Sequence, residues 1–364
     1  MKKLHRKGSV LWDMETLDSE VPLPRRLTNV ALVYNLKKGL DERTPDAEAE
    51  YDSIDTVHAI QHALESSGLT VELIEADRFL PERLKESRAD FAFNIAEGLS
   101  GRGREAQIPA LFAIMDVPFT GSDETALAVA LDKALCKRLA SASRVRTPRF
   151  KVVAAGEKAR GLRFPVIVKP NAEGSSKGIG ETCVVEDAAA LDALTQRNLS
   201  LYGGEMLCEE YVPGREFTVG LLGNGKSLTV FEPMEIVYTR PTQGAYHVYS
   251  YEVKRQYQSY VRYECPADVA PGAAQEMKRM AARIFRLLGC RDLARVDFRL
   301  DASGRPWFIE INPLPGLAPG YSDYPMLAGF QGVAYDDLIR AILSAAAARY
   351  GFSCGWEGMR HGRA

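Results

Sequence analysis

Residues 295–316, near the C-terminus, limit how this chain can fold more than any other segment does. Their apolar side chains alternate with polar ones on both sides of a polar, glycine-containing break at residues 301–305. Alternation with a period of two is typical of β-strands, so the segment predicts two antiparallel strands joined by a turn. We expect Leu300 to face Trp307 across this hairpin.

The same register gives the hairpin a charged face. It places Asp297 opposite Glu310, and Arg295 opposite Asn312. Two carboxylates that oppose each other on a sheet repel, and a cation between them removes the repulsion. Two carboxylates and an amide supply oxygen ligands that suit Mg²⁺ or Mn²⁺, ions that also hold substrate phosphates. We therefore expect a divalent-metal site here; the alternative is an exposed hairpin edge with scattered charges.

Composition narrows the class of protein. The chain has 364 residues, more than one hydrophobic core usually serves, so two or three domains are expected. Lys plus Arg number 46 against 48 Asp plus Glu, and this balance argues against nucleic acid or an anionic membrane surface as the main partner. No membrane-spanning run is found, and Asp13 and Glu15 interrupt the apolar run that a signal peptide needs. Six widely spaced cysteines without a C-x-x-C pair are typical of reduced cytosolic thiols.

The N-terminal part predicts an open α/β layer. Residues 1–28 are charged and contain proline, and we expect them to form a flexible arm. Short apolar runs that suit buried parallel strands lie at 29–35, 69–76 and 90–96. Between the first two runs, the apolar residues of 51–67 recur at the spacing of a helix. A glycine-rich loop at 98–107 follows, where open α/β sheets usually bind ligands, although a plain strand-to-helix connection explains it equally well.

Two lysines stand out in the middle of the chain. Lys133 lies inside a predicted helix whose N-cap is expected to be Ser122, and a lysine there could simply be solvated. Lys169 comes at the end of an apolar strand, and a Gly/Ser-rich loop with Ser175 and Ser176 follows it. Backbone N–H groups, hydroxyls and lysines in such a loop make a site for phosphate oxygens; a surface hairpin is the alternative.

Residues 220–227 literally match the P-loop expression G-x-x-x-x-G-K-[ST]. A working P-loop lies between a strand and a helix whose N-terminus holds phosphate, whereas both flanks here are rich in β-branched and aromatic residues. Asn224 followed by Gly225 is a hairpin signal. The match therefore predicts a turn.

The C-terminal part contains two segments without clear periodicity. Residues 246–263 mix six tyrosines with charges and predict a long loop that closes over a ligand, or a surface packed with tyrosines. Residues 312–328 predict a Pro/Gly-rich loop. Helices are expected at 271–288 and 335–350, and the polar tail that follows is expected to be mobile.

Seven motifs, taken in order, resemble the ATP-grasp superfamily, and within it the D-alanine–D-alanine ligase group, over residues 29–350. They are the glycine-rich loop at 98–105, PFTGS at 118–122, LDK at 131–133, VKPNAEGSSKG at 168–178, EEYVPGREFTV at 209–219, RVDF at 295–298 and EINPLPG at 310–316. Each motif alone is weak, whereas their order and spacing together are specific.

The resemblance implies an ATP-grasp fold of the α/β (α+β) class, in which an N-terminal open parallel α/β domain precedes two α+β subdomains that clasp ATP. It implies domains at 29–122, 123–217 and 218–350, between the arm at 1–28 and the tail at 351–364. By position, the residues that bind ATP would be Lys133, Lys169, Ser175, Ser176, Glu209, Tyr211, Val212 and Glu216. The magnesium ligands would be Asp297, Glu310 and Asn312, in agreement with the register argument.

The reaction that the resemblance implies has two steps. ATP phosphorylates a substrate carboxylate, and an amine then attacks the acyl phosphate to give an amide, ADP and phosphate. Arg295 would stabilise the phosphorylated intermediate, Ser175 would belong to the loop that closes over the phosphates, and Lys254 would reach the γ-phosphate from a mobile loop. Gly316 would line the pocket of the carboxylate substrate, and Glu50 would orient the amine of the first substrate.

The chain departs from the D-alanine ligase pattern at substrate positions. Glu97 followed by Gly98 stands where that group has His-Gly, and Arg255 stands where its mobile loop has tyrosine. The serine that holds the carboxylate of the second substrate falls at Tyr321 or Ser322. The added arginine suggests a partner that is more anionic or larger than free alanine.

These observations predict a cytoplasmic, ATP- and Mg²⁺-dependent carboxylate–amine ligase with small-molecule amino-acid substrates; a homodimer is expected only from the family. Two alternatives of the same class are a ligase that joins other amino acids and one that joins an amino acid to a specialised metabolite. The alternative from a different class is a nucleotide-binding regulatory protein without turnover. Such a binder has no need of both Asp297 and Glu310.

Overall fold

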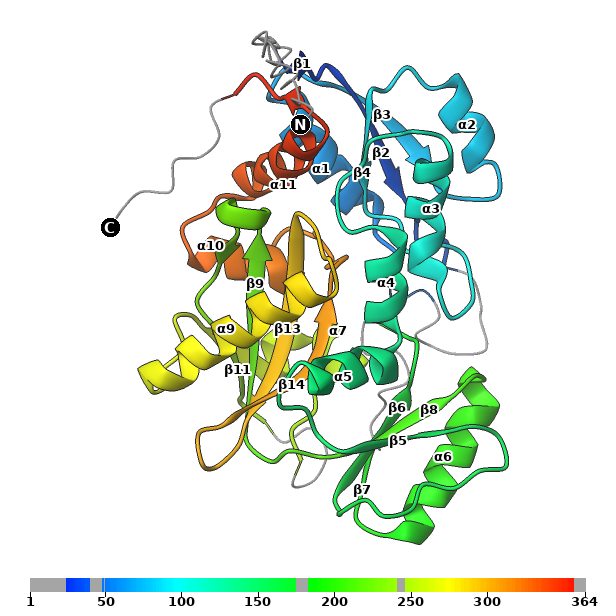
Figure 1. Cartoon of the computed structure of the whole chain (residues 1–364), viewed down its shortest axis with the longest axis vertical. Coiled ribbons are helices and arrows are strands. Elements are labelled where there is room, and N and C mark those ends of the chain that lie inside the picture. The colour runs from blue at the N-terminus through cyan, green and yellow to red at the C-terminus, as the bar shows by residue number, and fades with distance from the viewer. Residues whose placement is uncertain (1–23, 40–47, 49, 175–182, 241–245, 357–364) are drawn as a thin grey trace, which may run out of the picture.

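A computed structural model describes the chain except for residues 1–23, 40–47, 49, 175–182, 241–245 and 357–364 (Figure 1). Most of the expected arm, the end of the expected tail, and Ser175 and Ser176 therefore lie outside the described residues. Three larger sheets follow one another along the described chain, and a two-stranded sheet pairs its two ends. Among the described helices, none combines the length and the apolar character that crossing a lipid bilayer requires.

The N-terminal sheet is parallel and has the strand order β3-β2-β4. Its elements are β2 (Asn29–Tyr34), α1 (Ile54–Glu65), β3 (Thr70–Glu75), α2 (Leu80–Glu86), β4 (Phe91–Asn94), the 3-10 helix η1 (Arg104–Ala106) and α3 (Gln107–Ile114). Helices α1 and α11 (Tyr335–Arg349) cover one face of the sheet, and α2 and α3 cover the other. The four middle residues of β2 are apolar and buried, as is typical of a strand covered on both faces, and the predicted open α/β layer is confirmed.

The central sheet is antiparallel and has the strand order β5-β8-β6-β7. Its elements are β5 (Phe150–Val153), β6 (Val166–Pro170), β7 (Val184–Val185), α6 (Ala188–Tyr202) and β8 (Met206–Glu210). Helix α6 packs Leu191, Leu194 and Leu199 against the sheet. Figure 1 shows this unit at one end of the molecule, away from the N-terminal sheet.

The third sheet has the strand order β12-β11-β9-β13-β14, and β10 pairs with β9. Its strands are β9 (Arg215–Leu222), β10 (Thr229–Val230), β11 (Met234–Tyr238), β12 (Val261–Glu264), β13 (Leu293–Leu300) and β14 (Pro306–Asn312). Its hydrophobic cluster includes residues of α4 (Glu124–Leu131), α5 (Lys133–Ala142) and α9 (Pro271–Leu287). The segment that matches the P-loop expression begins in the last residues of β9, and the rest of it forms the predicted turn to antiparallel β10, with the short 3-10 helix η2 (Gly225–Ser227).

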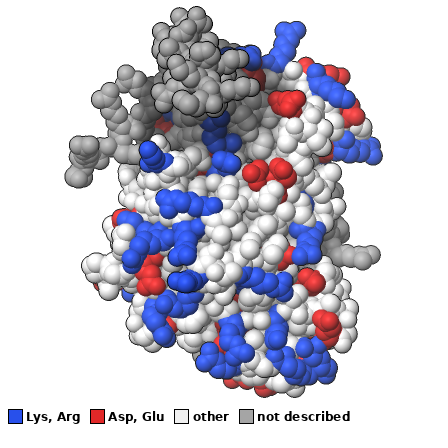
Figure 2. Space-filling view, viewed as in Figure 1, with Lys and Arg blue, Asp and Glu red and all other residues white. Residues whose placement is uncertain are grey.

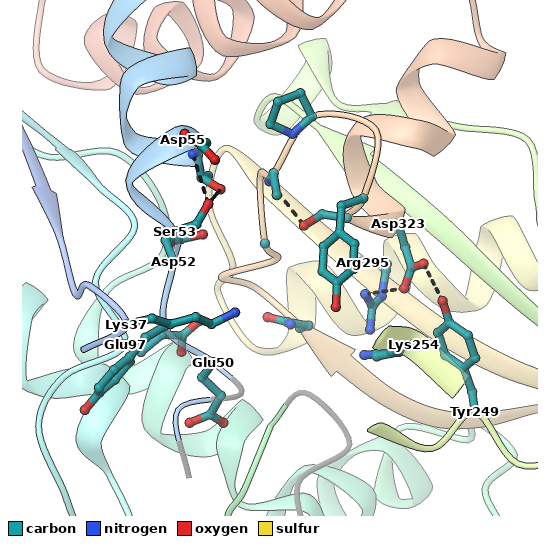
Figure 3. Close-up of a pocket in the computed structure, with 18 residues that line it drawn as sticks. Lys37, Glu50, Asp52, Ser53, Asp55, Glu97, Tyr249, Lys254, Arg295 and Asp323 are labelled. Carbon is teal, nitrogen blue, oxygen red and sulfur yellow. Dashed lines mark hydrogen bonds and ion pairs between the residues drawn. The ribbon is translucent and has the colours of Figure 1, made fainter. Parts of the chain in front are cut away.

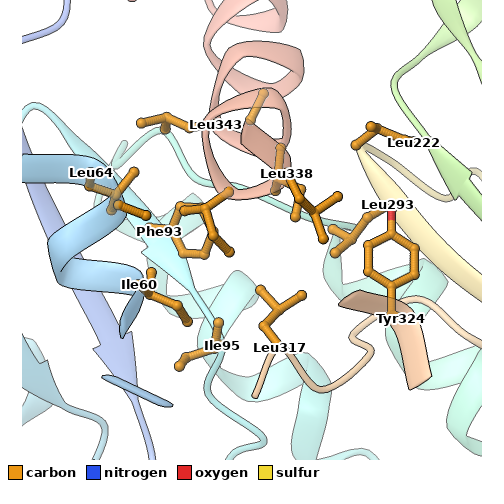
Figure 4. Packing of buried hydrophobic residues seen from close by; sticks show 14 of the residues in the cluster. Ile60, Leu64, Phe93, Ile95, Leu222, Leu293, Leu317, Tyr324, Leu338 and Leu343 are labelled. Carbon is orange, nitrogen blue, oxygen red and sulfur yellow. The ribbon is translucent and has the colours of Figure 1, made fainter. Parts of the chain in front are cut away.

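One hydrophobic core joins the N-terminal sheet to the third sheet. Figure 4 shows Leu338 of α11 between Phe93 of β4 on one side and Leu293 and Tyr324 on the other. Tyr324 belongs to α10 (Asp323–Phe330) and is fully buried. Because burial of apolar surface is favourable, this shared core fixes the two sheets relative to each other. The side chains that project between the sheets are therefore held at fixed positions too.

The structure corrects the predicted start of the helix that carries Lys133. Helix α4 follows the N-cap Asp123, whose side chain accepts from the Ala126 N–H at 2.9 Å. Ser122, the predicted N-cap, instead accepts the Arg291 N–H at 3.0 Å. Asp132 then ends α4 and caps α5, so Lys133 is the first residue of a new helix rather than an interior one.

The two segments without periodicity also differ from expectation. Residues 246–263 contain α7 (Tyr251–Arg255), α8 (Tyr257–Tyr260) and the start of β12, not one long loop. Ser250 caps α7 by accepting from the Val253 N–H at 3.3 Å. The expected loop at 312–328 ends early, because α10 begins within it.

Both ends of the described chain pair with each other. Strand β1 (Arg25–Arg26) runs parallel to β15 (Phe352–Ser353), and the buried Leu27 donates its N–H to the Ser353 carbonyl at 2.9 Å. The expected arm and tail are therefore wrong at these residues, where backbone pairing and apolar burial add them to the fold. The domain boundaries as a whole stay a prediction.

The surface carries both signs of charge. Figure 2 shows Lys and Arg interspersed with Asp and Glu, with Lys and Arg more frequent over the lower half of the face in view. This mixture agrees with the formal net charge of −2. The expectation that nucleic acid is not a main partner stays a prediction.

Candidate active site

The hairpin of β13 and β14 has the charged face that its sequence predicts. Arg295 pairs with Asn312, and Asp297 pairs with Glu310. Strand β13 lies between β9 and β14, and β14 is an edge strand of the sheet, so its pairing with β13 holds Glu310 and Asn312 in place. The predicted register is confirmed at this end of the hairpin.

The turn end of the same hairpin differs by one residue. The register shifts just after Asp297, so that Leu300 pairs with Pro306 and not with Trp307. A β-bulge of this kind bends a strand and is common beside active sites. The prediction of Leu300 opposite Trp307 is wrong, and the bulge restores the predicted pairing at the charged face.

Arg295 is buried between two carboxylates. Its guanidinium donates to the two oxygens of Asp297 at 3.0 and 2.9 Å and to Asp323 at 3.0 Å. Burial opposes the charge, but Asp297 and Asp323 hold the pKa of Arg295 above its ordinary value. The two-pronged contact fixes the plane of a permanent cation at the site.

Glu310 stands among cations. Its carboxylate lies 3.6 Å from Nζ of Lys133, which also donates to the Glu173 carbonyl. Burial raises the pKa of Glu310, but the charges of Lys133, Lys169 and Arg295 outweigh burial and lower that pKa to about 2. Glu310 is therefore an anion throughout the physiological range, as a metal ligand must be.

The hairpin's donor set fits a hard divalent cation. Among the described residues there is no group of three or more His, Cys, Asp or Glu side chains that could hold a metal ion. Asp297, Glu310 and Asn312 nevertheless bring two carboxylates and an amide together from neighbouring strands. Mg²⁺ commonly takes one or two carboxylates and completes its shell with water and substrate phosphates, so a site with few protein ligands is what this ion requires.

A cleft between the central and third sheets is lined by the residues that the resemblance assigns to ATP. From the predicted ATP-binding set, the residues that line this cleft are Lys169, Glu209, Tyr211, Val212 and Glu216. The predicted catalytic and metal residues that line it are Lys254, Arg295, Asp297 and Glu310. Lys133 lines an adjoining cavity together with Glu310 and Asn312. The structure thus brings residues from five separate motifs to one place.

Two lysines share Glu209 at the back of this cleft. Lys169 lies 3.8 Å from one of its oxygens, and the buried Lys137 lies 2.6 Å from the other. Burial lowers the pKa of Lys137. Burial also opposes the charge of Lys169, but Glu209 and Glu310 raise the pKa of Lys169 above its ordinary value. Lys169 is therefore protonated at neutral pH, which suits contact with phosphate oxygens.

Arg299 ties the walls of the cleft together. Its guanidinium donates to five acceptors, namely the carbonyls of Val212, Gly214 and His247, the carboxylate of Glu216 and the hydroxyl of Tyr211. Sequence reasoning missed this residue. Strand alternation was the available signal, because Arg295, Asp297 and Arg299 project from the same face of β13.

A cavity of about 380 Å³ opens beside the hairpin. Figure 3 shows Lys37, Glu50 and Glu97 on one side of it and Arg295 and Lys254 on the other. Of the residues predicted to contact substrates, those that line it are Glu50, Gly316, Tyr321 and Ser322. The cavity and the cleft share Lys254 and Arg295, so molecules bound in the two spaces would reach the same cations.

The loop that follows β14 packs closely around Gly316, which lines the cavity. The Ser322 hydroxyl accepts the Ala318 N–H at 3.1 Å. A Cβ atom at Gly316 would lie 2.8 Å from that hydroxyl, so only glycine fits there without a shift. Gly316 and Ser322 therefore shape the wall of the cavity together.

Glu50 has a partner that sequence reasoning missed. Its carboxylate accepts two hydrogen bonds from Arg104, one of them from Nε at 3.0 Å, and a third from the Gly174 N–H at 2.6 Å. Arg104 also donates to the Ala172 carbonyl at 2.9 Å. The glycine-rich loop that contains Arg104 thus connects the N-terminal sheet to the strand-end loop after Lys169.

Helix α7 turns Lys254 inward and Arg255 outward. Lys254 lines both cavities, and its Nζ lies 5.4 Å from the centre of the Tyr249 ring. Burial, and then the charge of Arg295, lowers the pKa of Lys254. Arg255 is exposed and lines neither cavity. Consecutive helical residues project about 100° apart, which separates Arg255 from Lys254; the contact of Arg255 with a substrate stays a prediction.

Comparison with known proteins identifies relatives of this chain. The family model described as "D-ala D-ala ligase C-terminus" matches residues 141–344. A D-alanine–D-alanine ligase of Bordetella avium is 32% identical over 295 residues, which cover 80% of this chain and 88% of that protein. An uncharacterised protein of Sinorhizobium fredii, y4sG, is 35% identical over 279 residues, which cover 76% of this chain and 81% of that protein.

A solved structure also resembles the chain. It is the crystal structure of a D-alanine–D-alanine ligase from Bacillus anthracis complexed with ATP, and it matches with a TM-score of 0.69 at 19% sequence identity. The match covers 89% of this chain and 98% of that chain. At this identity the likeness concerns the fold.

Proposed function

Because this chain belongs to the D-alanine–D-alanine ligase family, we propose that it uses Mg²⁺ and ATP to join the carboxylate of a small amino acid to an amine. Its ATP-grasp fold and its class of activity, an ATP-dependent carboxylate–amine ligase, are as the sequence predicted. The metal, the roles of single residues and the identity of the substrates are the proposal that follows.

In this proposal ATP lies in the cleft between the central and third sheets. Tyr211 and Val212 would border the adenine, and Glu216 would accept the ribose hydroxyls. Lys133 and Lys169 would contact the phosphates at the other end of the cleft. The lining of the cleft supports this orientation, because its cations gather around Glu310 whereas Tyr211 and Val212 lie at the β8–β9 connection.

Asp297, Glu310 and Asn312 would hold Mg²⁺, or Mn²⁺ in its place. When bound, the ion would offset phosphate charge and polarise the transferring phosphoryl group. Arg295, oriented by Asp297 and Asp323, would donate to the same phosphoryl oxygens.

In the first step, a carboxylate oxygen of the substrate forms a bond to the γ-phosphorus as the bond to the β-γ bridging oxygen breaks, and ADP leaves with that electron pair. Lys254 and Arg295 stand between the cavity and the cleft, where they offset the charge of both reactants. In the second step, the nitrogen lone pair of the amine attacks the acyl carbon, the bond to phosphate breaks with its electron pair going to the phosphate, and the nitrogen's proton passes to that phosphate. Exclusion of water protects the acyl phosphate.

The observation that carries this proposal is the set of four cations around Glu310: Lys133, Lys169, Arg295 and Lys254. Cations gathered at one cleft, beside two carboxylates that suit a divalent ion, match the charges of a metal-bound polyphosphate. ADP release over a panel of amino acids and amines tests the function. We expect release to require an acid, and amide formation to require an amine. Retained ATP binding with no ADP release for any pair would favour a regulatory binder.

The relatives named D-alanine–D-alanine ligase make D-alanine the first acid to test in that panel. Arg255 is exposed, and the expected partner that is more anionic or larger than free alanine stays a prediction that the same panel tests. We further propose a cytoplasmic enzyme, which the six free cysteines support, and a homodimer, which light scattering after size-exclusion chromatography would test.

A further inference from the structure

The substrate cavity contains a carboxylate that the proposed reaction leaves without a role. Glu97 follows the end of β4 and lines the cavity, on the side where Figure 3 places Glu50 and Lys37. We find no hydrogen bond or ion pair to its side chain among the described residues. Glu97 is therefore a carboxylate within reach of a ligand and without a partner from the described chain.

Glu50, by contrast, already has its charge offset. Both of its oxygens accept hydrogen bonds from the Arg104 guanidinium, and one also accepts the Gly174 N–H. A substrate ammonium at Glu50 would have to compete with a guanidinium held in two-pronged geometry. Glu50 therefore suits a positioning role, in which it holds Arg104 and the loop at Gly174 together.

The surroundings of Glu97 favour a cationic ligand. Burial raises the pKa of Glu97 well above its ordinary value, and the nearby Glu105 and Glu50 raise it further, against the opposing effect of Arg104. Lys37 lines the same side of the cavity, but no ion pair joins it to Glu97. A buried carboxylate gains most from a cation that arrives with its own hydrogen bonds, because pairing removes the cost of an unpaired charge.

The opposite wall has the complementary charge. Arg295 and Lys254 face the cavity from β13 and α7, where the reacting carboxylate has to meet the γ-phosphate. An amino acid carries a carboxylate at one end and an ammonium group close by. With its carboxylate toward Arg295, its ammonium group can point to the wall that holds Glu97.

We propose that Glu97, rather than Glu50, is the specificity-determining residue that binds the ammonium group of the acid substrate, so that the enzyme selects amino acids over the corresponding deaminated acids. This inference rests on the proposed ligase function and names the substrate class of its first step. It also gives a physical reason for glutamate at the position where D-alanine ligases have histidine, since a carboxylate attracts an ammonium group directly.

Trapping of the acyl phosphate tests the inference without knowledge of the amine substrate. The full-length enzyme is given ATP, Mg²⁺ and hydroxylamine, which converts an acyl phosphate to a hydroxamate, with pairs such as alanine and propionate. In the Glu97→Gln variant we expect the ratio of kcat/KM for the amino acid to that for its deaminated acid to fall about tenfold or more, chiefly through KM. Glu97→Asp, which keeps the charge, should retain part of the ratio.

Two further variants serve as comparisons. Glu86→Gln changes an exposed glutamate at the end of α2 and should keep the wild-type ratio. Glu50→Gln should lower hydroxamate formation from both acids to a similar extent, because it frees Arg104. An unchanged ratio in Glu97→Gln, or a loss of the ratio confined to Glu50→Gln, would overturn the inference.

The failure of the ligase function would look different. If the wild-type enzyme formed neither hydroxamate nor ADP with any acid, the proposed function would fail, and calorimetry with alanine and a non-hydrolysable ATP analogue would decide about Glu97. Alanine binding that Glu97→Gln weakens and Glu86→Gln does not would support the inference. Absent binding in the wild type, or equal binding in Glu97→Gln, would overturn it.

Discussion

Glu310 is the single residue on which the proposed metal site depends most directly. Glutamine at this position keeps the size of the side chain and removes the charge that faces Lys133 and opposes Asp297. We expect Glu310→Gln to fold and to lose turnover by roughly a hundredfold or more, with partial recovery at higher Mg²⁺ concentration. ADP release against Mg²⁺ concentration, beside thermal melting, measures both effects. The exposed Glu65→Gln is the control, and unchanged ADP release in Glu310→Gln would remove the metal assignment.

Asp52 is a residue whose protonation should make stability depend on pH. Burial raises the pKa of its carboxyl from 3.8 to about 7, against the opposing charge of Lys37. The folded state therefore holds the proton more tightly, so the stabilisation is complete below about pH 3.8, declines as the pH rises and is lost above about pH 7. Asp52→Asn should resemble the wild type near pH 4 and be more stable by roughly 1–4 kcal/mol at pH 8, from 1.36 kcal/mol per pKa unit.

Urea unfolding of both proteins without ligand, at several pH values between about 4 and 8, measures this difference. The free energy of unfolding of the wild type should fall relative to that of Asp52→Asn across the range. A difference that stays constant with pH would show that Asp52 is ionised in the folded protein and would contradict the prediction.

Residues of the hairpin were predictable because alternation is a local property of one short segment. Asp297 opposite Glu310 follows from the sequence alone, and the structure confirms it. The pairing of Glu50 with Arg104 was not predictable, because 54 residues separate them and the contact depends on how the glycine-rich loop folds. Single residues that act through distant partners therefore require the tertiary structure.

At the scale of elements, the start of α5 connects stability to the proposed nucleotide site. Asp132 caps this helix by accepting from the Leu135 N–H at 3.0 Å, and it also accepts from Asn171 at 2.9 Å. Because Lys133 is the next residue, loss of the cap should both weaken the helix and displace that lysine. We expect Asp132→Ala to lower the free energy of unfolding by about 1–2 kcal/mol and to raise the KM for ATP.

A second N-cap provides the matched control. Asp187 caps α6 by accepting from the Ala190 N–H at 2.8 Å, on an exposed part of the central unit. Asp187→Ala should lose a similar amount of stability and leave the KM for ATP near the wild-type value. Urea unfolding and ATP titration of ADP release measure both variants. Equal effects on the KM would show that the cap of α5 does not position Lys133.

Elements with a clear period were predicted well, and breaks in the period were not. The strands of the N-terminal sheet and α9 fall close to their predicted bounds, since their apolar residues repeat regularly. The division between α4 and α5 was missed because its cause, the extended backbone of Asp132, leaves the composition helical. Helices α7 and α8 were missed because five and four residues are too few to show a period.

At the scale of the whole molecule, the order of the three sheets was predictable from the order of the motifs, but their packing was not. Leu338 of α11 shares a core with Phe93 and Leu293, which come from different sheets. The pairing of β1 with β15 likewise joins the two ends of the described chain. Sequence patterns describe which face of an element is apolar, and they do not say which other element covers it.

Asp292 connects these parts through polar contacts. It is fully buried, and it accepts from Arg349 of α11 at 3.0 and 2.7 Å, from Asn224 at 2.6 Å and from the Gly121 N–H at 2.8 Å. Arg349 also donates to the Phe119 carbonyl at 3.0 Å. One ion pair therefore joins the N-terminal part, the third sheet and the last long helix.

We expect Asp292→Asn to lower the free energy of unfolding by about 3–5 kcal/mol, because it leaves the Arg349 guanidinium without its counter-charge. Asp292 has a φ of +64°, which asparagine also tolerates, so backbone strain does not explain such a loss. Asp116→Asn is the matched control: its φ is +55°, it is exposed, and it should change stability by less than about 0.5 kcal/mol.

Removing both partners, in Asp292→Asn with Arg349→Met, should cost less than the sum of the single changes. Urea unfolding of the wild type, Asp292→Asn, Arg349→Met and the double variant measures the coupling. Additive losses, or an Asp292→Asn variant as stable as Asp116→Asn, would show that the ion pair does not hold the three parts together.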